Sequence, residues 1–125
     1  MSLRILVVED NPMNAALARI LLQHEGNTVL EAASGAALRA LLAAGEAVDL
    51  VLMDIQLPDI DGVTLLTDVR QAMPAVPVVA LTAHALHGDE ARLMASGFEA
   101  VMTKPIDTRT FAAKVAEHAA RGRRT

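Results

Sequence analysis

The sequence predicts an α/β fold in which one parallel β-sheet is covered by helices on both faces. Short apolar runs alternate with longer segments of helical period along the whole chain. The central apolar runs are nearly continuous rather than alternating, which is typical of parallel strands buried on both faces. Repeated strand–helix alternation also favours right-handed crossovers and a doubly wound sheet. We therefore expect five strand–helix units in a row.

The length and composition fit one domain, so we expect residues 1–125 to share a single core, with a short basic tail at 121–125. The chain has 125 residues, of which 53% are hydrophobic and 21% are charged. This balance is that of a globular protein rather than a disordered one. The formal net charge is −4, which argues against nucleic acid as a partner because nucleic-acid-binding domains carry a basic surface.

The chain contains no cysteine, which excludes disulfides, thiolate catalysis and zinc–thiolate sites. No apolar run reaches the roughly 18 residues of a membrane span. The first run, residues 3–8, is too short for the core of a signal peptide and leads directly into Glu9. We therefore expect a soluble, cytoplasmic protein without a membrane partner.

Five short segments rich in Val, Leu, Ile and Ala are expected to form strands. The first, third and fourth are the most apolar and are expected at the centre of the sheet, with the other two beside them. The five segments are residues 3–8, 28–32, 48–53, 76–81 and 100–103.

Five helices are expected between and after these strands. Four of them follow a residue whose side chain can accept free backbone N–H groups of the first turn, namely Asn11, Ser34, Asp61 and Asp107. The fourth helix is expected from about residue 85 to Ser96, where Gly97 stops it. The first helix carries one apolar stripe that we expect to face the core, made of Met13, Leu17, Ile20 and Leu21.

Polar side chains follow the ends of four expected strands. Glu9 and Asp10 end the first strand, Asp54 the third, Thr82 the fourth and Lys104 the fifth. In open parallel sheets, ligands bind outside the carboxyl ends of the strands, at a change in strand order. We therefore expect these five side chains to converge on one edge of the sheet.

Three carboxylates at this edge predict a metal site. Like charges so close repel one another or share protons unless a cation lies between them. Oxygen ligands without Cys or a nearby His favour a hard cation, so Mg²⁺ is the expected cofactor, with Mn²⁺ as an alternative. Asp10 and Asp54 are expected as direct ligands, Glu9 as a direct or water-mediated one, and the backbone carbonyl of Gln56 as a further ligand.

Lys104 and Thr82 fit a phosphoryl group bound beside this metal. A lysine neutralises one phosphoryl oxygen, and a hydroxyl group can hydrogen-bond another. Positioning and electrostatics are the main requirements for phosphoryl transfer. The nucleophile is then expected to be the carboxylate of Asp54, which gives an acyl phosphate. Each residue alone also has an ordinary structural explanation, such as helix capping by Asp10.

Four short motifs carry these residues: Val-Glu-Asp-Asn-Pro-Met-Asn at 8–14, Met-Asp-Ile-Gln-Leu-Pro at 53–58 with Asp-Gly at 61–62, Ala-Leu-Thr-Ala at 80–83, and Thr-Lys-Pro at 103–105. Together they resemble response-regulator receiver domains over essentially the whole chain. The resemblance implies a flavodoxin-like five-stranded parallel sheet in the order 2-1-3-4-5 with five flanking helices. It also implies a partner, a histidine kinase or a histidine phosphotransfer protein, whose phosphohistidine supplies the phosphoryl group in a two-component system or phosphorelay.

By this resemblance, Asp54 is the phosphoacceptor, Glu9 and Asp10 complete the acidic triad, Thr82 is the switch hydroxyl and Lys104 binds the phosphate. The motifs are most similar to receivers of hybrid kinases and to single-domain cell-cycle regulators, and both kinds of protein fit this chain. No effector domain follows in the sequence, so we expect no DNA-binding output within these 125 residues.

Five other residues have expected roles near the site. Ala83 belongs to the phosphate-binding segment, and Pro105 is a candidate for a cis peptide bond. Gln56 and His84, two residues after the acceptor and the switch hydroxyl, are candidate modulators of the lifetime of the acyl phosphate, although neither is acidic. Asp59, like Asp61, is explained by turn chemistry and helix capping.

The expected readout departs from that of many receivers. Val101 stands three residues before the lysine, where many receivers carry Tyr or Phe, so the usual aromatic rotamer signal is absent there. Phe98 is expected to be a core residue beneath the fourth helix. We expect Thr82 to move toward the phosphate and to shift residues 83–88, which switches the face formed by the fourth helix, fifth strand and fifth helix.

Two other functions are compatible with much of the same residue set. A phosphohydrolase of the haloacid dehalogenase type also uses an Asp after a central strand, but it needs a second Asp where this chain has Gln56. A docking module that is never phosphorylated is disfavoured because the set of site residues is complete. We therefore expect a signalling phosphoacceptor rather than an enzyme, present as a monomer or weak dimer.

Overall fold

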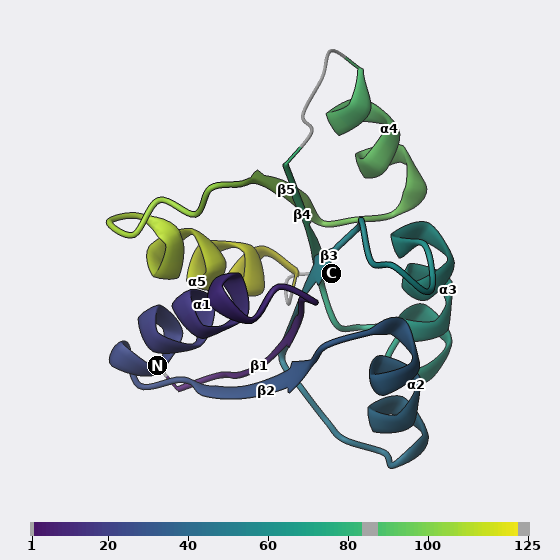
Figure 1. The fold of residues 1–125 in the computed structure, drawn as a ribbon, viewed down its shortest axis with the longest axis horizontal. Coiled ribbons are helices and arrows are strands. Elements are labelled where there is room, and N and C mark those ends of the chain that lie inside the picture. Colours follow the sequence, from purple (N-terminus) through teal and green to yellow (C-terminus); the bar gives the residue numbers. More distant parts are fainter. Residues whose placement is uncertain (1, 84–87, 123–125) are drawn as a thin grey trace.

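The computed structural model describes residues 2–83 and 88–122, and these form one five-stranded parallel sheet (Figure 1). Its strands are β1 (Arg4–Val8), β2 (Thr28–Ala32), β3 (Leu50–Asp54), β4 (Val78–Thr82) and β5 (Ala100–Thr103). Their order in space is β2-β1-β3-β4-β5, and every neighbouring pair is parallel. The predicted flavodoxin-like doubly wound sheet is therefore confirmed.

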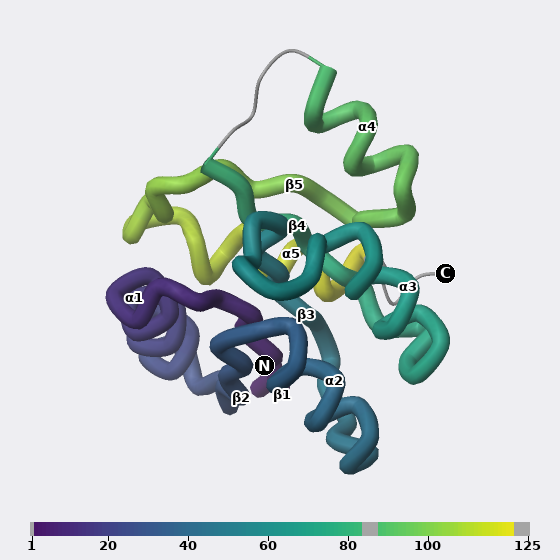
Figure 2. Tube along the Cα trace, turned by 45° about the vertical axis from the view of Figure 1, so that its right-hand side comes forward, coloured from purple at the N-terminus to yellow at the C-terminus, as the bar shows by residue number. Residues whose placement is uncertain are grey.

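Helices cover both faces of this sheet, with α1 and α5 on one face and α2, α3 and α4 on the other (Figures 1 and 2). Their bounds are α1 (Pro12–His24), α2 (Gly35–Ala43), α3 (Gly62–Ala72), α4 (Asp89–Ser96) and α5 (Phe111–Gly122). The chain order alternates strand and helix throughout, as expected for a doubly wound fold.

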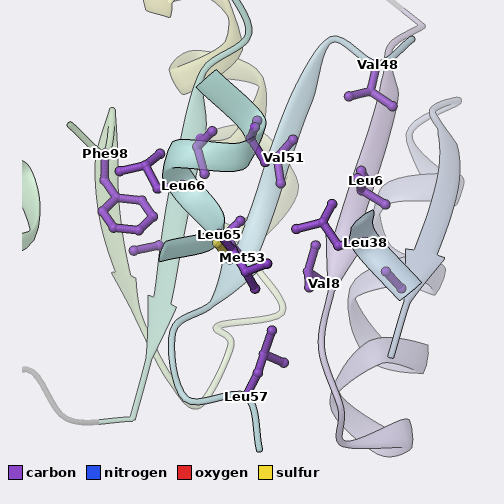
Figure 3. Packing of buried hydrophobic residues seen from close by; sticks show 14 of the residues in the cluster. Leu6, Val8, Leu38, Val48, Val51, Met53, Leu57, Leu65, Leu66 and Phe98 are labelled. Atoms are coloured by element: carbon purple, nitrogen blue, oxygen red, sulfur yellow. The ribbon is translucent and has the colours of Figure 1, made fainter. Parts of the chain in front are cut away.

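The core consists of two apolar clusters, one on each face of the sheet. In β1, Leu6 and Val8 join the cluster beneath α2, α3 and α4, whereas Ile5 and Val7 join the cluster beneath α1 and α5. This alternation follows from the two-residue period of a strand. Phe98 is 3% exposed and belongs to the first cluster, which Figure 3 shows. The prediction that Phe98 is a core residue is confirmed.

Three strands begin later than predicted. β1 starts one residue later, at Arg4, and β3 and β4 start two residues later, at Leu50 and Val78. The apolar residue that was expected to open the third strand, Val48, is nevertheless buried. An apolar run indicates which residues are buried, and buried residues extend beyond those that pair in the sheet. Strand starts predicted from apolar runs are therefore too early.

The prediction for the core-facing side of α1 is only partly right, since Leu21 packs against the core cluster on that face of the sheet. The buried residues of this helix are Ala18 and Leu22, whereas Met13 is 81% and Ile20 is 59% exposed. An alanine adds little to a hydrophobic pattern, but its small side chain suits the close contact between a helix and a sheet. The sequence pattern therefore placed two outward-facing residues, Met13 and Ile20, in the core-facing stripe.

Three of the predicted helix caps are present. The side chain of Asn11 accepts the N–H groups of Met13 and Asn14, at the start of α1. Ser34 accepts the N–H group of Ala37, and the Asp61 side chain caps α3 in the same way. Short polar side chains thus satisfy N–H groups that have no partner within the helix.

The last helix starts later than the prediction, and the predicted start of the fourth cannot be compared with the described residues. Asp107 accepts the N–H group of Arg109 through its side chain, but α5 itself begins at Phe111. The described part of α4 begins at Asp89, with Gly88 as its cap at a φ of 90°. The predicted start near residue 85 lies outside the described residues.

Candidate functional site

The sheet register brings the predicted site residues to one edge. Val8 pairs with Met53, so Glu9 and Asp10 leave β1 beside Asp54, the last residue of β3. Thr82, the last residue of β4, pairs with Thr103, which directly precedes Lys104. The convergence expected from the strand ends is therefore present in the fold.

Backbone hydrogen bonds extend the sheet one residue beyond three of its strand ends. Each joins the N–H group just past one strand to a carbonyl of the neighbouring strand. They run from Glu9 to Ala32 (3.0 Å), from Ile55 to Leu81 (3.2 Å) and from Lys104 to Thr82 (2.8 Å). The edge that carries the candidate site residues is thus part of the hydrogen-bonded sheet.

Lys104 joins the two buried carboxylates of the site. Its Nζ atom lies 2.5 Å from Oε1 of Glu9 and 3.1 Å from Oδ2 of Asp54. The side chains of Glu9 and Asp54 are only 1% and 5% exposed. Within the described residues, Glu9 Oε1 makes no hydrogen bond besides this ion pair. Two buried negative charges thus share one positive charge, which leaves an excess of negative charge in a poorly solvated place.

Asp54 is held as an oriented carboxylate. Its Oδ1 atom accepts the N–H group of Gln56 at 2.9 Å, and its Oδ2 atom faces Lys104. Burial by itself raises the pKa of Asp54, but the Gln56 N–H group and the contacts with Glu9 and Lys104 outweigh burial and lower that pKa below its ordinary value. Asp54 therefore carries the negative charge that a nucleophile needs.

Burial also affects the pKa values of Glu9 and Lys104. Burial raises the pKa of Glu9 and Asp54 adds to the effect, although Lys104 and the N–H group of Asn11 oppose it. Burial also disfavours the charged form of Lys104, but its contacts with Glu9 and Asp54 prevail and raise the pKa of the lysine. Lys104 is therefore a cation at neutral pH. Glu9 is the carboxylate whose charged form a second cation would stabilise most.

The acidic cluster fits a divalent metal ion. One carboxylate oxygen each from Glu9, Asp10 and Asp54 lies within 4.8 Å of the other two. Glu9 and Asp54 are buried and Asp10 is exposed, so an ion shared by the three would face solvent on one side. Mg²⁺ suits such a place because it binds oxygen ligands and retains several waters. The buried Glu9 oxygen that makes no hydrogen bond besides its ion pair is also consistent with a ligand role.

The remaining predicted residues surround this cluster. Thr82 is fully buried at the end of β4, and Ala83 after it is exposed. The side chain of Gln56 is exposed, and the peptide bond between Lys104 and Pro105 is cis. His84 lies outside the described residues.

Val101 lies on β5 beside a cavity of about 600 Å³. The cavity lies between β5 and α5, where Phe111 and His118 also line it, and Glu90 of α4 completes one side. Val101 itself is partly buried against the cluster beneath α4. The position that carries an aromatic ring in many receivers therefore borders open space here.

One residue near the site, Asp59, makes a long-range contact that the sequence did not predict. Asp59 accepts N–H groups from Gly35 and Ala36 at the start of α2, which lie 24 and 23 residues earlier in the chain. Local turn chemistry does not predict this contact, because it depends on how α2 and the loop after β3 pack together.

A family model for the response regulator receiver domain matches residues 5–116. This chain belongs to the response regulator receiver domain family. As a receiver domain it is a component of two-component signalling, in which the partners are histidine kinases or histidine phosphotransfer proteins. The match places the chain in this family rather than among phosphohydrolases of the haloacid dehalogenase type.

Two curated relatives and one solved structure show what the receiver resembles. It is 39% identical over 114 residues to the polar-differentiation response regulator DivK of Brucella ovis, with 89% of this chain and 91% of DivK covered. It is 40% identical over 115 residues to the sensor protein GacS of Pseudomonas syringae pv. syringae, with 87% of this chain and 12% of GacS covered. The receiver therefore spans a small part of GacS but most of DivK.

The solved structure is a CheY-like response regulator receiver domain protein from Methanospirillum hungatei JF-1. Its fold matches this receiver with a TM-score of 0.86 at 27% identity, and the alignment covers 97% of this chain and 96% of that one.

None of the helices within residues 2–83 and 88–122 is long and apolar enough to cross a membrane.

Proposed function

We propose that this receiver accepts a phosphoryl group on Asp54 from a phosphohistidine of a histidine kinase or phosphotransfer protein, in a reaction that requires Mg²⁺. The observation that carries the proposal is the arrangement around Asp54. Its carboxylate is buried, ionised and oriented by one N–H group and one lysine, and two further acids lie within 4.8 Å.

The transfer forms one bond and breaks one. A carboxylate oxygen of Asp54 attacks phosphorus, the bond between phosphorus and the donor imidazole breaks, and the electron pair of that bond returns to the imidazole nitrogen. Lys104 Nζ lies 3.1 Å from the Asp54 carboxylate, so its charge is within reach of a phosphoryl oxygen bound there. The buried hydroxyl group of Thr82, at the end of the next strand, would hydrogen-bond a second phosphoryl oxygen.

Asp10, Asp54 and Glu9 would hold the metal ion, together with the backbone carbonyl of Gln56. A bound divalent cation supplies charge neutralisation for the phosphoryl oxygens. The chain contributes the remaining requirements, since it keeps Asp54 ionised and excludes most solvent from Glu9 and Asp54. These residues act by positioning and electrostatics, as phosphoryl transfer demands.

The surface of α1 supports a protein donor. Met13 and Ile20 are large apolar residues that are 81% and 59% exposed. They are seven residues apart and so lie on one side of the helix, and α1 begins two residues after Asp10. Exposed apolar groups next to a reactive centre are typical of a surface that another protein covers. We propose that the phosphodonor docks on this side of α1.

The test is phosphorylation by acetyl phosphate with Mg²⁺, followed by intact mass measurement. Wild type is expected to gain one phosphoryl group, whereas Asp54→Asn is expected to gain none, because the amide is not a nucleophile of this kind. Asp68→Asn is the matched control, since it removes an acid from a surface ion pair with Arg39 on α2. Removal of Mg²⁺ with a chelator should also prevent the mass gain. A wild-type protein that gains no mass under these conditions would refute the proposal and favour an unphosphorylated docking module.

A further inference from the structure

Asp59 holds the start of α2 from a distant part of the chain. Its Oδ1 atom accepts the N–H group of Gly35 at 2.9 Å, and its Oδ2 atom accepts that of Ala36 at 3.0 Å. Ser34 accepts the next N–H group, that of Ala37, at 3.1 Å. The first three N–H groups of α2 are therefore satisfied by two side chains, one local and one from the loop after β3.

These contacts keep Asp59 in its charged form. The N–H groups of Gly35 and Ala36 hold the pKa of Asp59 below its ordinary value. The positive end of the α2 dipole acts in the same direction. The loop thus carries an anion whose two oxygens are both used by one helix terminus.

Apolar packing anchors the same loop at two more points. A Cβ atom on Gly35 would lie 2.8 Å from Cδ1 of Ile60, so Ile60 packs directly on the start of α2. A Cβ atom on Gly62 would lie 2.7 Å from the Cα atom of Ile55, so the two ends of the loop touch each other. Residues 55–61 are therefore fixed at both ends and at the contact with α2.

This loop also carries the groups nearest to the phosphoacceptor. The N–H group of Gln56 donates to Asp54 Oδ1 at 2.9 Å, and the Gln56 carbonyl is the proposed backbone ligand of the metal. Only Leu57 and Pro58 separate Gln56 from Asp59. Leu57 is buried in the core, and the proline ring restricts its own backbone angle. A shift of Asp59 would therefore be transmitted to Gln56 through a stiff connection.

We propose that Asp59 is a positioning residue for the metal site, because its hold on α2 sets where the backbone of Gln56 lies relative to Asp54. This inference rests on the proposed function, since it assigns a role in Mg²⁺ binding and phosphorylation. It differs from a purely structural role, in which Asp59 would only stabilise α2 as any helix cap does.

The matched control is the other cap of the same helix. Ser34→Ala removes one N–H acceptor from α2 and is expected to destabilise that helix, but the Ser34 side chain has no hydrogen bond to the loop. Asp59→Ala removes a cap from the same helix and also frees the loop. Asp59→Asn keeps one carbonyl oxygen as acceptor, so it preserves the fold while it weakens the same contact.

The experiment measures Mg²⁺ affinity by titrating the backbone amide NMR shifts of wild type and the three variants. The phosphorylation rate with acetyl phosphate is then measured by intact mass, at Mg²⁺ concentrations well below and well above the dissociation constant. Loss of a residue that orients a metal ligand typically costs roughly 10–100-fold in affinity or activity. We expect Asp59→Ala to weaken Mg²⁺ binding by about tenfold, Asp59→Asn by less, and Ser34→Ala to leave it unchanged. High Mg²⁺ should restore the rate of Asp59→Ala.

Two outcomes would overturn the inference in distinguishable ways. If wild type binds Mg²⁺ and is phosphorylated, but Asp59→Ala and Asp59→Asn both behave as Ser34→Ala does, the positioning role is wrong and the proposed function stands. If wild type neither binds Mg²⁺ nor gains a phosphoryl group, the proposed function fails and the role of Asp59 fails with it.

Discussion

The two segments that follow the ends of β3 and β4 are held in contrasting ways. After β3, the loop is anchored to α2 by Asp59 and leads into α3, which has four buried residues, Gly62, Leu65, Leu66 and Val69. After β4, the described part of α4 starts at Asp89, its cap Gly88 provides no side-chain hydrogen bond, and Leu93 is its buried residue. The contrast indicates that tertiary contacts fix the segment after β3 more firmly than the described residues after β4.

The difference in burial has an approximate energetic scale. Full burial of a Val or Leu side chain is worth about 1.5–3 kcal/mol, and α3 buries three such side chains where the described part of α4 buries one. The acidic residues Asp89 and Glu90 in the first turn of α4 provide a favourable interaction with the helix dipole. This interaction is smaller, at about 0.3–1 kcal/mol for each charge. Helix α4 is therefore the easier of the two to displace.

The largest expected effect is the loss of stability when the glycines at the starts of α3 and α4 are replaced by alanine. Gly62→Ala should lower the free energy of unfolding by about 3 kcal/mol, because the new Cβ atom meets backbone and overpacks the site. Gly88→Ala places its Cβ in open space and strains only a backbone with a φ of 90°, which costs about 1 kcal/mol. Urea denaturation of both variants measures the difference. Equal losses would contradict the contrast between the segments.

An intermediate effect is expected when a phosphoryl mimic binds. Beryllofluoride with Mg²⁺ should shift the backbone amide signals of Ala83, Gly88 and Asp89 more than those of Gly35 and Ala36, because the former follow Thr82 and lack the Asp59 anchor. Two-dimensional NMR spectra with and without the mimic measure both sets. Unperturbed signals at Ala83 and Gly88 would show that the change does not pass through the segment after Thr82. The spectrum of Asp54→Asn serves as the control.

The smallest expected effect is on the pH dependence of stability, through His118 of α5. Burial, with Arg121 nearby, lowers the pKa of His118 from its ordinary 6.5, although Glu117 and Glu99 oppose this shift. The folded state then binds fewer protons than the unfolded state, so this contribution to stability is complete above pH 6.5 and is lost as pH falls through 6.5 toward the folded-state value. We expect a loss of under about 1 kcal/mol because His118 is partly solvated.

His118→Gln should flatten this pH dependence, since glutamine does not titrate. Urea midpoints of the two proteins are compared at about pH 7.5 and about pH 5.5, so that the other titrating groups contribute equally to both. An unchanged pH dependence in His118→Gln would show that another group is responsible.

Much of the fold was predictable because its signals are local. The nearly continuous apolar runs identified all five strands, and the caps at Asn11, Ser34 and Asp61 identified three helix starts. Placement of Glu9 and Asp54 at one edge followed from strand order, because parallel strands end on the same side of a sheet. Strand starts were less accurate, since an apolar residue such as Val48 is buried without pairing.

Within the site, the sequence by itself determined which residue types stand at the strand ends: three acids, a hydroxyl group and a lysine. Only the tertiary structure decided that Lys104 lies between Glu9 and Asp54, that Met13 and Ile20 face outward, and that Asp59 holds α2. The physical reason is the range of the interaction. Strand burial and helix caps depend on neighbours within a few residues, whereas these three features depend on contacts between segments that meet only when the sheet and its helices have packed.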